Sequence, residues 1–109
     1  MKYLMLVVVP PGATPGPDAP ADPDAWVTEM DARRVRVMGQ QLQAASAAST
    51  VRVRDGKRLV TDGPFAEAAE HIAGFDVLDC ADLDEAIEVA GKHPVAGFGL
   101  LELRPFIQE

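Results

Sequence analysis

The sequence lacks the features that define several large classes of protein. Among its 109 residues there is one cysteine, Cys80, so the chain can form no internal disulfide and no zinc site built from cysteines. No apolar run approaches the roughly 20 residues that a transmembrane helix needs. Basic residues are outnumbered by acidic residues, 10 to 17, and the net charge is −7. We therefore expect no binding to nucleic acid, which requires a basic surface, and no membrane span.

Three local features have plain explanations. Arg33, Arg34 and Arg36 form a small basic cluster, which we interpret as a solvated stretch near a helix end. The start of the chain has too little positive charge for a signal peptide and no clear cleavage site, so a buried strand and a cytoplasmic location are expected. Cys80 lies in an apolar and acidic run, which favours a buried structural thiol over a nucleophile.

What the sequence does contain fits one domain spanning residues 1–109. Apolar residues make up 48% of the chain, which is ample for a single core. There is no glycine-rich phosphate loop and no cluster of metal ligands, so neither a cofactor nor a metal is expected.

The patterns along the chain predict five strands and two helices. Strands are expected over residues 3–9, 50–54, 58–61, 74–79 and 98–104, with Asp55-Gly56 as a type I′ hairpin turn. Helices are expected from Asp22 and Asp82, because each can cap a helix, and Glu85 completes a capping box after Asp82. Residues 40–49 are interpreted as an irregular linker and residues 65–70 as a short helical turn. The proline-rich loop at 10–23 is either a connector or a flap over a site.

These elements predict an α+β fold, a ferredoxin-like antiparallel sheet with two helices on one face. The first strand is apolar at nearly every position, so both of its faces need cover. Two helices can cover only one face of the sheet, and the other would expose a large apolar patch. A second copy packed sheet against sheet is the simplest cover, so we expect a homodimer.

A longer stretch resembles a known family. Residues 50–67, which contain Asp62-Gly63-Pro64-Phe65, look like the signature of YCII-related proteins of the DGPF type. Residues 72–75, 83–87, 92–94 and 103–105 resemble the same family in its usual order, and residues 26–42 match more weakly. The resemblance implies a dimeric α+β barrel. It implies less about activity, because relatives in the wider group include a dehydrochlorinase, the same barrel hosts cyclases and monooxygenases, and some members are encoded near extracytoplasmic-function sigma factors.

The chain departs from the family pattern in its charged positions. Where relatives usually have Thr-Lys-Glu-Gln after the motif, this chain has Ala68-Ala69-Glu70-His71, so the usual lysine is Ala69 and His71 is new. Arg34 stands where a glycine is common near the end of the first helix. Some relatives have a histidine on the first helix that is proposed to pair with an aspartate, but no histidine precedes His71 here. The lost basic residues argue against a strongly anionic ligand.

Three residues near the DGPF motif are candidates for catalysis. Asp62, held at a strand end beside Phe65, would serve as a general base, or would only bind backbone amides of its own turn. His71 has an unperturbed pKa near neutrality and would transfer protons. Glu67 would be an acid partner to either residue, or only a helix cap.

Four residues are candidates for ligand binding. Trp26 and Phe65 would form walls for a planar ligand, although aromatic side chains at such positions also serve in the core. His93 would contact the ligand or cap the end of a helix. Arg104 would bind a carboxylate or pair with Glu102.

Two functions follow. In the first, the protein binds a small organic molecule and acts as a cofactor-free enzyme, in which Asp62 and His71 shuttle protons in an elimination, dehydration, isomerisation or cyclisation. The expected site is a pocket between sheet and helices. In the second, it is a non-enzymatic accessory or regulatory protein, linked to an extracytoplasmic-function sigma factor system, and the DGPF turn is structural.

Overall fold

The computed structural model describes residues 1–17, 22–64 and 71–108. Its elements in chain order are β1 (Lys2–Val8), α1 (Asp24–Ala32), β2 (Arg36–Gln41), η1 (Ala45–Ala47), β3 (Ser49–Arg54), β4 (Lys57–Asp62), β5 (Ile72–Asp79), α2 (Leu83–Gly91), η3 (Pro94–Gly97) and β6 (Leu100–Pro105).

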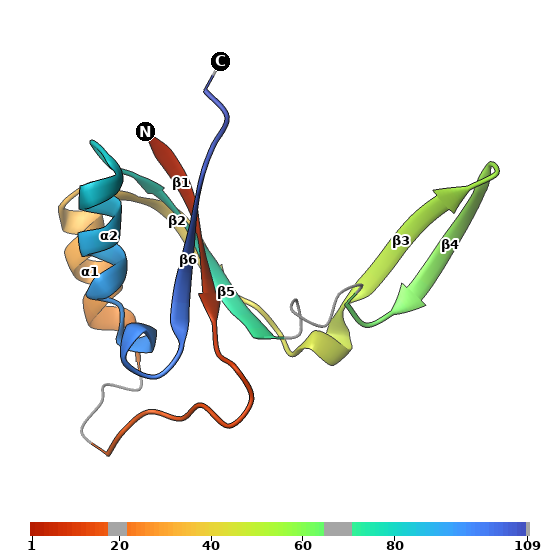
Figure 1. Cartoon of the computed structure of the whole chain (residues 1–109), viewed down its shortest axis with the longest axis horizontal. Coiled ribbons are helices and arrows are strands. Elements are labelled where there is room, and N and C mark those ends of the chain that lie inside the picture. The colour runs from red at the N-terminus through yellow and green to blue at the C-terminus, as the bar shows by residue number, and fades with distance from the viewer. Residues whose placement is uncertain (18–21, 65–70, 109) are drawn as a thin grey trace.

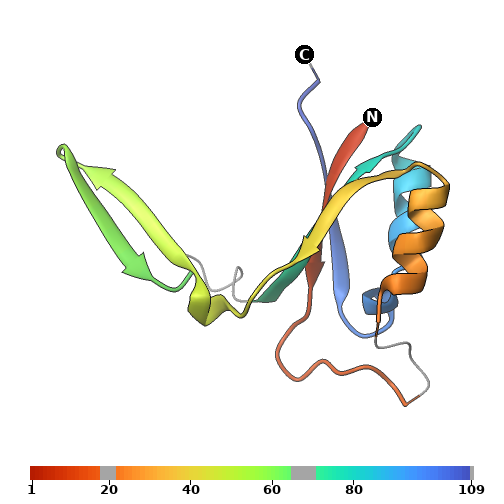
Figure 2. The ribbon, with the colours of Figure 1, turned by 180° about the vertical axis from the view of Figure 1, so that it is seen from behind.

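Four strands form the main sheet in the order β2-β5-β1-β6, and each neighbouring pair is antiparallel. Both helices lie on one face of this sheet, and no described element covers the opposite face (Figures 1 and 2). Strands β3 and β4 form a separate two-stranded sheet. In the sequence this hairpin lies between β2 and β5, which are neighbours in the main sheet. The α+β class and the ferredoxin-like arrangement are therefore confirmed.

The central strand β1 has apolar side chains on both faces, as the sequence predicted. Tyr3, Met5 and Val7 point toward the helices and are buried. Their neighbours Leu4, Leu6 and Val8 lie on the open face of the sheet and are partly exposed. Strand β5 adds Phe75 and Val77 to the open face, because they pair with Leu6 and Leu4.

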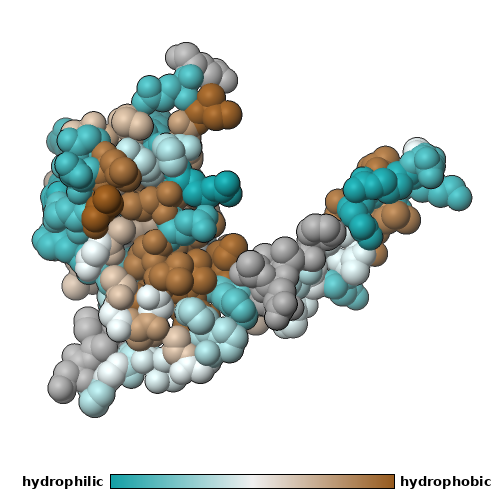
Figure 3. All heavy atoms as spheres, viewed as in Figure 1, coloured by the Kyte–Doolittle hydropathy of each residue, from teal (hydrophilic) through white to brown (hydrophobic). Residues whose placement is uncertain are grey.

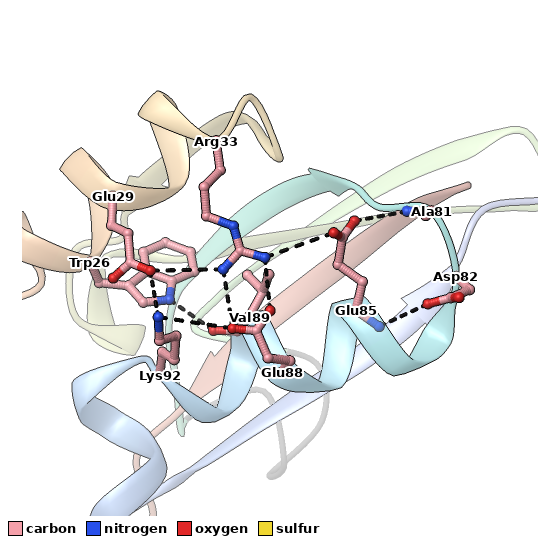
Figure 4. A network of polar contacts seen from close by, with 9 residues as sticks. All are labelled: Trp26, Glu29, Arg33, Ala81, Asp82, Glu85, Glu88, Val89 and Lys92. Carbon is pink, nitrogen blue, oxygen red and sulfur yellow. Dashed lines mark hydrogen bonds and ion pairs between the residues drawn. The ribbon is translucent and has the colours of Figure 1, made fainter.

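The two helices are joined by one buried contact and several exposed ones (Figure 4). The indole Nε1 of Trp26 donates a buried hydrogen bond of 2.9 Å to the carbonyl of Val89. Arg33 binds both carboxylate oxygens of Glu88, at 2.7 and 3.1 Å, and Lys92 pairs with Glu29. Exposed ion pairs contribute little to stability, so the buried indole is the stronger link.

Local capping chemistry explains where the second helix and the hairpin form. The Asp82 side chain accepts from the backbone amide of Glu85 at 2.9 Å, and the Glu85 carboxylate accepts from the amide of Ala81. In the hairpin turn, Asp55 has φ 52° and Gly56 has φ 75°, so both central residues have the positive φ that a type I′ turn requires. Both predictions are confirmed.

The first helix differs slightly from the prediction. It begins at Asp24, and the Asp22 side chain still accepts a hydrogen bond of 3.0 Å from the Asp24 amide. Arg34 follows its last turn with φ 60°, a left-handed conformation in which a residue without Cβ is less strained. This conformation explains why a glycine suits that position.

The prediction of an irregular linker over residues 40–49 was wrong in part. The chain forms β2 from Arg36 to Gln41, an edge strand that pairs only with β5, and a turn of 3-10 helix at Ala45–Ala47. The sequence of β2 lacks apolar alternation, because Gly39, Gln40 and Gln41 occupy its second half. The predicted helical turn at 65–70 lies outside the described residues.

Cys80 is buried, with 2% of its surface exposed. Burial raises the pKa of its thiol, and the nearby carboxylates of Glu85 and Asp79 raise it further. The thiolate form is therefore disfavoured, and the interpretation as a structural thiol is confirmed.

Replacing Gly63 of the DGPF motif with alanine is expected to destabilise the fold by about 1 kcal/mol or more, because Gly63 has φ 91° and a Cβ is strained there. Its amide also donates to the Ala48 carbonyl at 2.7 Å, so the turn cannot relax freely. Thermal unfolding measures the effect. Gly97→Ala is the matched control, because a Cβ there meets no atom within 4 Å and no positive φ is needed. Equal melting temperatures for both variants would contradict the prediction.

Candidate functional site

A cavity of about 250 Å³ lies between the sheet and the helices, at the end where β1 finishes and α1 begins. Most of its wall is apolar, and the apolar residues in its lining come from several elements: Val7, Val9, Trp26, Val27, Phe75, Val95 and Phe98. The polar residues in the lining are Arg36, Gln40, Gln41, Asp76 and His93. Apolar walls with a few converging polar groups are typical of small-molecule sites.

The most unusual polar group in the cavity wall is Asp76 of β5. Its position in the strand places it on the face that packs under the helices, and 6% of its surface is exposed. Arg36 donates from Nε to Asp76 Oδ1 at 2.8 Å, and Arg36 also reaches Asp31 at 3.4 Å. Burial raises the pKa of the Asp76 carboxyl, and the hydrogen bond and charge of Arg36 only partly offset this.

The hydrogen bond from Arg36 reaches only one carboxylate oxygen of Asp76, Oδ1. Within the part of the chain that the structure describes, no donor contacts Oδ2. Asp76 is also one of the residues that line the cavity. Asp76 therefore presents a desolvated acceptor to whatever enters.

Gly39 makes room for this arrangement. It lies directly opposite Asp76 in the register of β2 and β5, and a Cβ on Gly39 would come within 2.0 Å of Asp76 Oδ1. It would also come within 2.8 Å of the Arg36 guanidinium. Any residue with a side chain would therefore displace the carboxylate from Arg36.

His93 supplies a second polar group and is held against Trp26. Its ring centroid lies 4.9 Å from that of Trp26 in an edge-on arrangement, and 7% of the residue is exposed. Burial lowers the pKa of His93. The Nδ1 atom accepts from the amide of Val95 at 3.1 Å, so the neutral ring carries its proton on Nε2. His93 thus caps the η3 turn as a neutral ring, not a helix end as a cation.

A second cavity, of about 500 Å³ and more open, lies where the β3–β4 hairpin joins the rest of the molecule. Its wall is formed by Leu42, Gln43, Ala44, Ala45, Ala47, Ala48, Pro64 and Ile72. None of these side chains titrates, so the described lining of this cavity offers no group for acid–base chemistry.

The structure separates the residues that the sequence singled out. Trp26 and His93 line the first cavity. Asp62 is exposed at the end of β4, and neither it nor His71 lines either of the two cavities. Phe65 and Glu67 lie outside the described residues. Arg104 is exposed on β6 with its Nε 3.8 Å from Glu102, the pairing that the sequence offered as an alternative to ligand binding.

Sequence reasoning missed Arg36 and Asp76. The basic cluster was interpreted as solvated, yet Arg33 joins the two helices and Arg36 binds a buried carboxylate. The available signal was the alternation of β5, where Gly74, Asp76 and Leu78 share the buried face. An aspartate on such a face needs a partner, and none is adjacent in sequence.

Two further findings concern metal binding and membrane spans in the described residues. Residues 1–17, 22–64 and 71–108 contain no group of three or more histidine, cysteine or acidic side chains placed to hold a metal. The helices in these ranges all fall short of the length and apolarity of a membrane span.

The fold and the cavity together define a small α+β domain with a candidate ligand site between sheet and helices. The chain belongs to the YCII-related domain family, whose model matches residues 1–109.

Two known proteins are similar to this chain. Uncharacterized protein R00369 of Rhizobium meliloti (strain 1021) is 48% identical over 67 residues, which is 60% of this chain and 54% of that protein. The match thus spans about half the length of that relative. Among solved structures, 5-chloro-2-hydroxyhydroquinone dehydrochlorinase (TftG) from Burkholderia phenoliruptrix AC1100, in complex with 2,5-dihydroxybenzoquinone, is 12% identical with a TM-score of 0.49, over 100% of this chain and 96% of that chain.

The buried His93 is expected to make stability fall as the pH falls from about 7 to 5. Its pKa is lower in the folded chain than in the unfolded chain, where it is about 6.5. The unfolded chain therefore takes up more protons in this range, and the free energy of unfolding decreases by up to about 1.4 kcal/mol per pH unit. Denaturant unfolding at several pH values measures the slope.

The matched variant is His93→Asn, because asparagine can still accept the Val95 amide but does not titrate. It should lose the part of the slope that His93 causes, whereas His71→Gln should keep it. A slope that survives in His93→Asn unchanged would show that another group is responsible.

Proposed function

We propose that the protein binds a small organic molecule in the cavity between sheet and helices, and that Asp76 is its principal polar contact. The observation that carries this proposal is the buried Asp76 carboxylate, which accepts from Arg36 through Oδ1 and lines the cavity. A carboxylate is costly to bury, so a purely structural wall would be better built from apolar residues.

The lining sets the kind of ligand. A volume of about 250 Å³ is below the usual range for drug-sized ligands, roughly 300–1,000 Å³, so the ligand is small. Aromatic and branched side chains surround it, which suits a planar apolar body. Arg36 and Asp76 neutralise each other, so a neutral or weakly acidic molecule fits better than an anion. A hydroxyl group on the ligand would donate to Asp76 Oδ2.

The same groups can perform acid–base chemistry without a cofactor. A carboxyl group with a raised pKa is a stronger base once ionised, which suits proton transfer. Asp76 would take a proton from a carbon or hydroxyl of the ligand, and the Nε2–H of His93 would donate to a developing oxyanion. Elimination, dehydration, isomerisation and cyclisation all need these two roles.

The other hypotheses from the sequence stay as predictions. Asp62 and His71, with Glu67 as partner, would form a separate acid–base centre at the DGPF turn. A non-enzymatic accessory protein would use the cavity for binding alone, and it would show saturable binding without turnover.

We also propose that the protein is a homodimer. The open face of the sheet carries a cluster of apolar side chains from neighbouring strands: Leu4, Leu6, Val8, Phe75, Val77 and Leu100. Figure 3 shows apolar side chains gathered over the sheet. A second copy packed face to face would remove them from water.

Asp76→Asn is expected to weaken binding of a phenol probe by about ten- to a hundredfold, because a hydrogen bond to a charged group contributes roughly 1.5–3 kcal/mol. Trp26 is the single tryptophan and lines the cavity, so its fluorescence reports occupancy. Asp79→Asn is the matched control, because Asp79 lies on the same strand but is exposed.

Once a substrate that the protein converts is found, turnover of the same variants distinguishes catalysis at Asp76, catalysis at the DGPF turn and a binding role alone. If Asp76 is the base, Asp76→Asn should lower turnover by about 10²–10⁴-fold. A comparable loss in Asp62→Asn and His71→Gln, with Asp76→Asn fully active, would move the catalytic centre to the DGPF turn. Saturable binding with no turnover of any kind would favour the accessory role.

A further inference from the structure

The β3–β4 hairpin, residues 49–62 (hereafter the arm), projects away from the rest of the molecule (the body) (Figures 1 and 2). Its two strands pair with each other and with no other described strand. Of the residues in β3 and β4, all but Thr50 are exposed. A lone two-stranded hairpin is marginally stable in water, so the arm has no visible source of stability in a single chain.

One face of the arm is apolar. Val51 pairs with Val60, and Val53 lies two residues from Val51 on the same side. These three side chains are 58%, 61% and 60% exposed, respectively. The other face carries Leu59 together with polar and basic residues. Exposed β-branched side chains gathered on one face of a hairpin indicate a surface that packs against something.

The single chain is also too extended for its size. Its radius of gyration is 15.9 Å, whereas a compact domain of this length has about 13 Å. It exposes 7517 Å² of surface, about 1,700 Å² more than the roughly 5,800 Å² expected for a compact monomer of 11.6 kDa. A standard interface buries about 800 Å² on each partner, so the excess is large enough for a stable contact.

The charge of the arm and its position beside the sheet indicate what packs against its apolar face. The arm has four basic residues and two acidic ones, a net charge of +2, in a chain of net charge −7, so the remainder carries −9. A basic arm on an acidic body is complementary to a second body. The arm also extends on the side of the sheet opposite the helices, in both views. A second copy seated on the open sheet face would lie beside it.

We propose that the arm of each protomer docks on the body of a second copy, with Val51, Val53 and Val60 inward and Arg58, which pairs with Val53 on the same face, against its acidic surface. The contact is reciprocal, because a two-fold dimer places each arm against the other body. This inference rests on the proposed homodimer and adds to it a second, arm-mediated interface.

Amide hydrogen exchange at several protein concentrations tests the arm directly. In a docked arm, the amides of β3 and β4 become protected as the dimer forms, whereas an undocked hairpin exchanges rapidly at all concentrations. A protein that sediments as a dimer while its arm amides remain unprotected would overturn the arm proposal and leave the dimer intact. A monomer at all concentrations would overturn both.

Variants on the two faces of the arm give the matched comparison. Val51→Ser with Val60→Ser should raise the dimer dissociation constant by about tenfold or more, while Leu59→Ser on the opposite face should change it little. Arg58→Glu leaves the valines in place and should also weaken the dimer, and less so at high salt. Equal dissociation constants for the wild type, the double variant and Arg58→Glu would contradict docking of the arm.

Discussion

The four strands of the main sheet have two faces, and the chain supplies helices for only one of them. On the covered face, β1 buries Tyr3, Met5 and Val7 beneath α1 and α2. The same strand places Leu4, Leu6 and Val8 on the bare face. Successive side chains of a strand point to opposite faces of the sheet. The apolar run of β1 therefore places apolar side chains on the bare face as well as beneath the helices. Both the proposed ligand site and the proposed contact with a second copy depend on this one-sided cover.

On the covered face, a cavity lies between sheet and helices near the start of α1. There the polar pair of Arg36 and Asp76 replaces apolar packing, and Gly39 opposite Asp76 leaves room for its carboxylate. A buried charge is a cost that packing alone does not explain. A ligand hydroxyl at Asp76 Oδ2 would offset that cost, which links the packing defect to the proposed function.

Much of the fold could be predicted because it depends on local chemistry. Asp55-Gly56 specifies its turn, Asp82 and Glu85 specify a helix start, and the apolar run of β1 specifies a central strand. The edge strand β2 escaped prediction, since it pairs on one side only and carries no apolar alternation. The site escaped as well, because Arg36 and Asp76 are 40 residues apart and only the register of β2 with β5 brings them together.

The most direct test of this account is the mass of the protein in solution, because the proposed homodimer is what would cover the open face of the sheet. Light scattering at micromolar concentration should give twice the 11.6 kDa of one chain. A stable particle of 11.6 kDa would contradict it, since the open face and the arm would then both face water in the working protein.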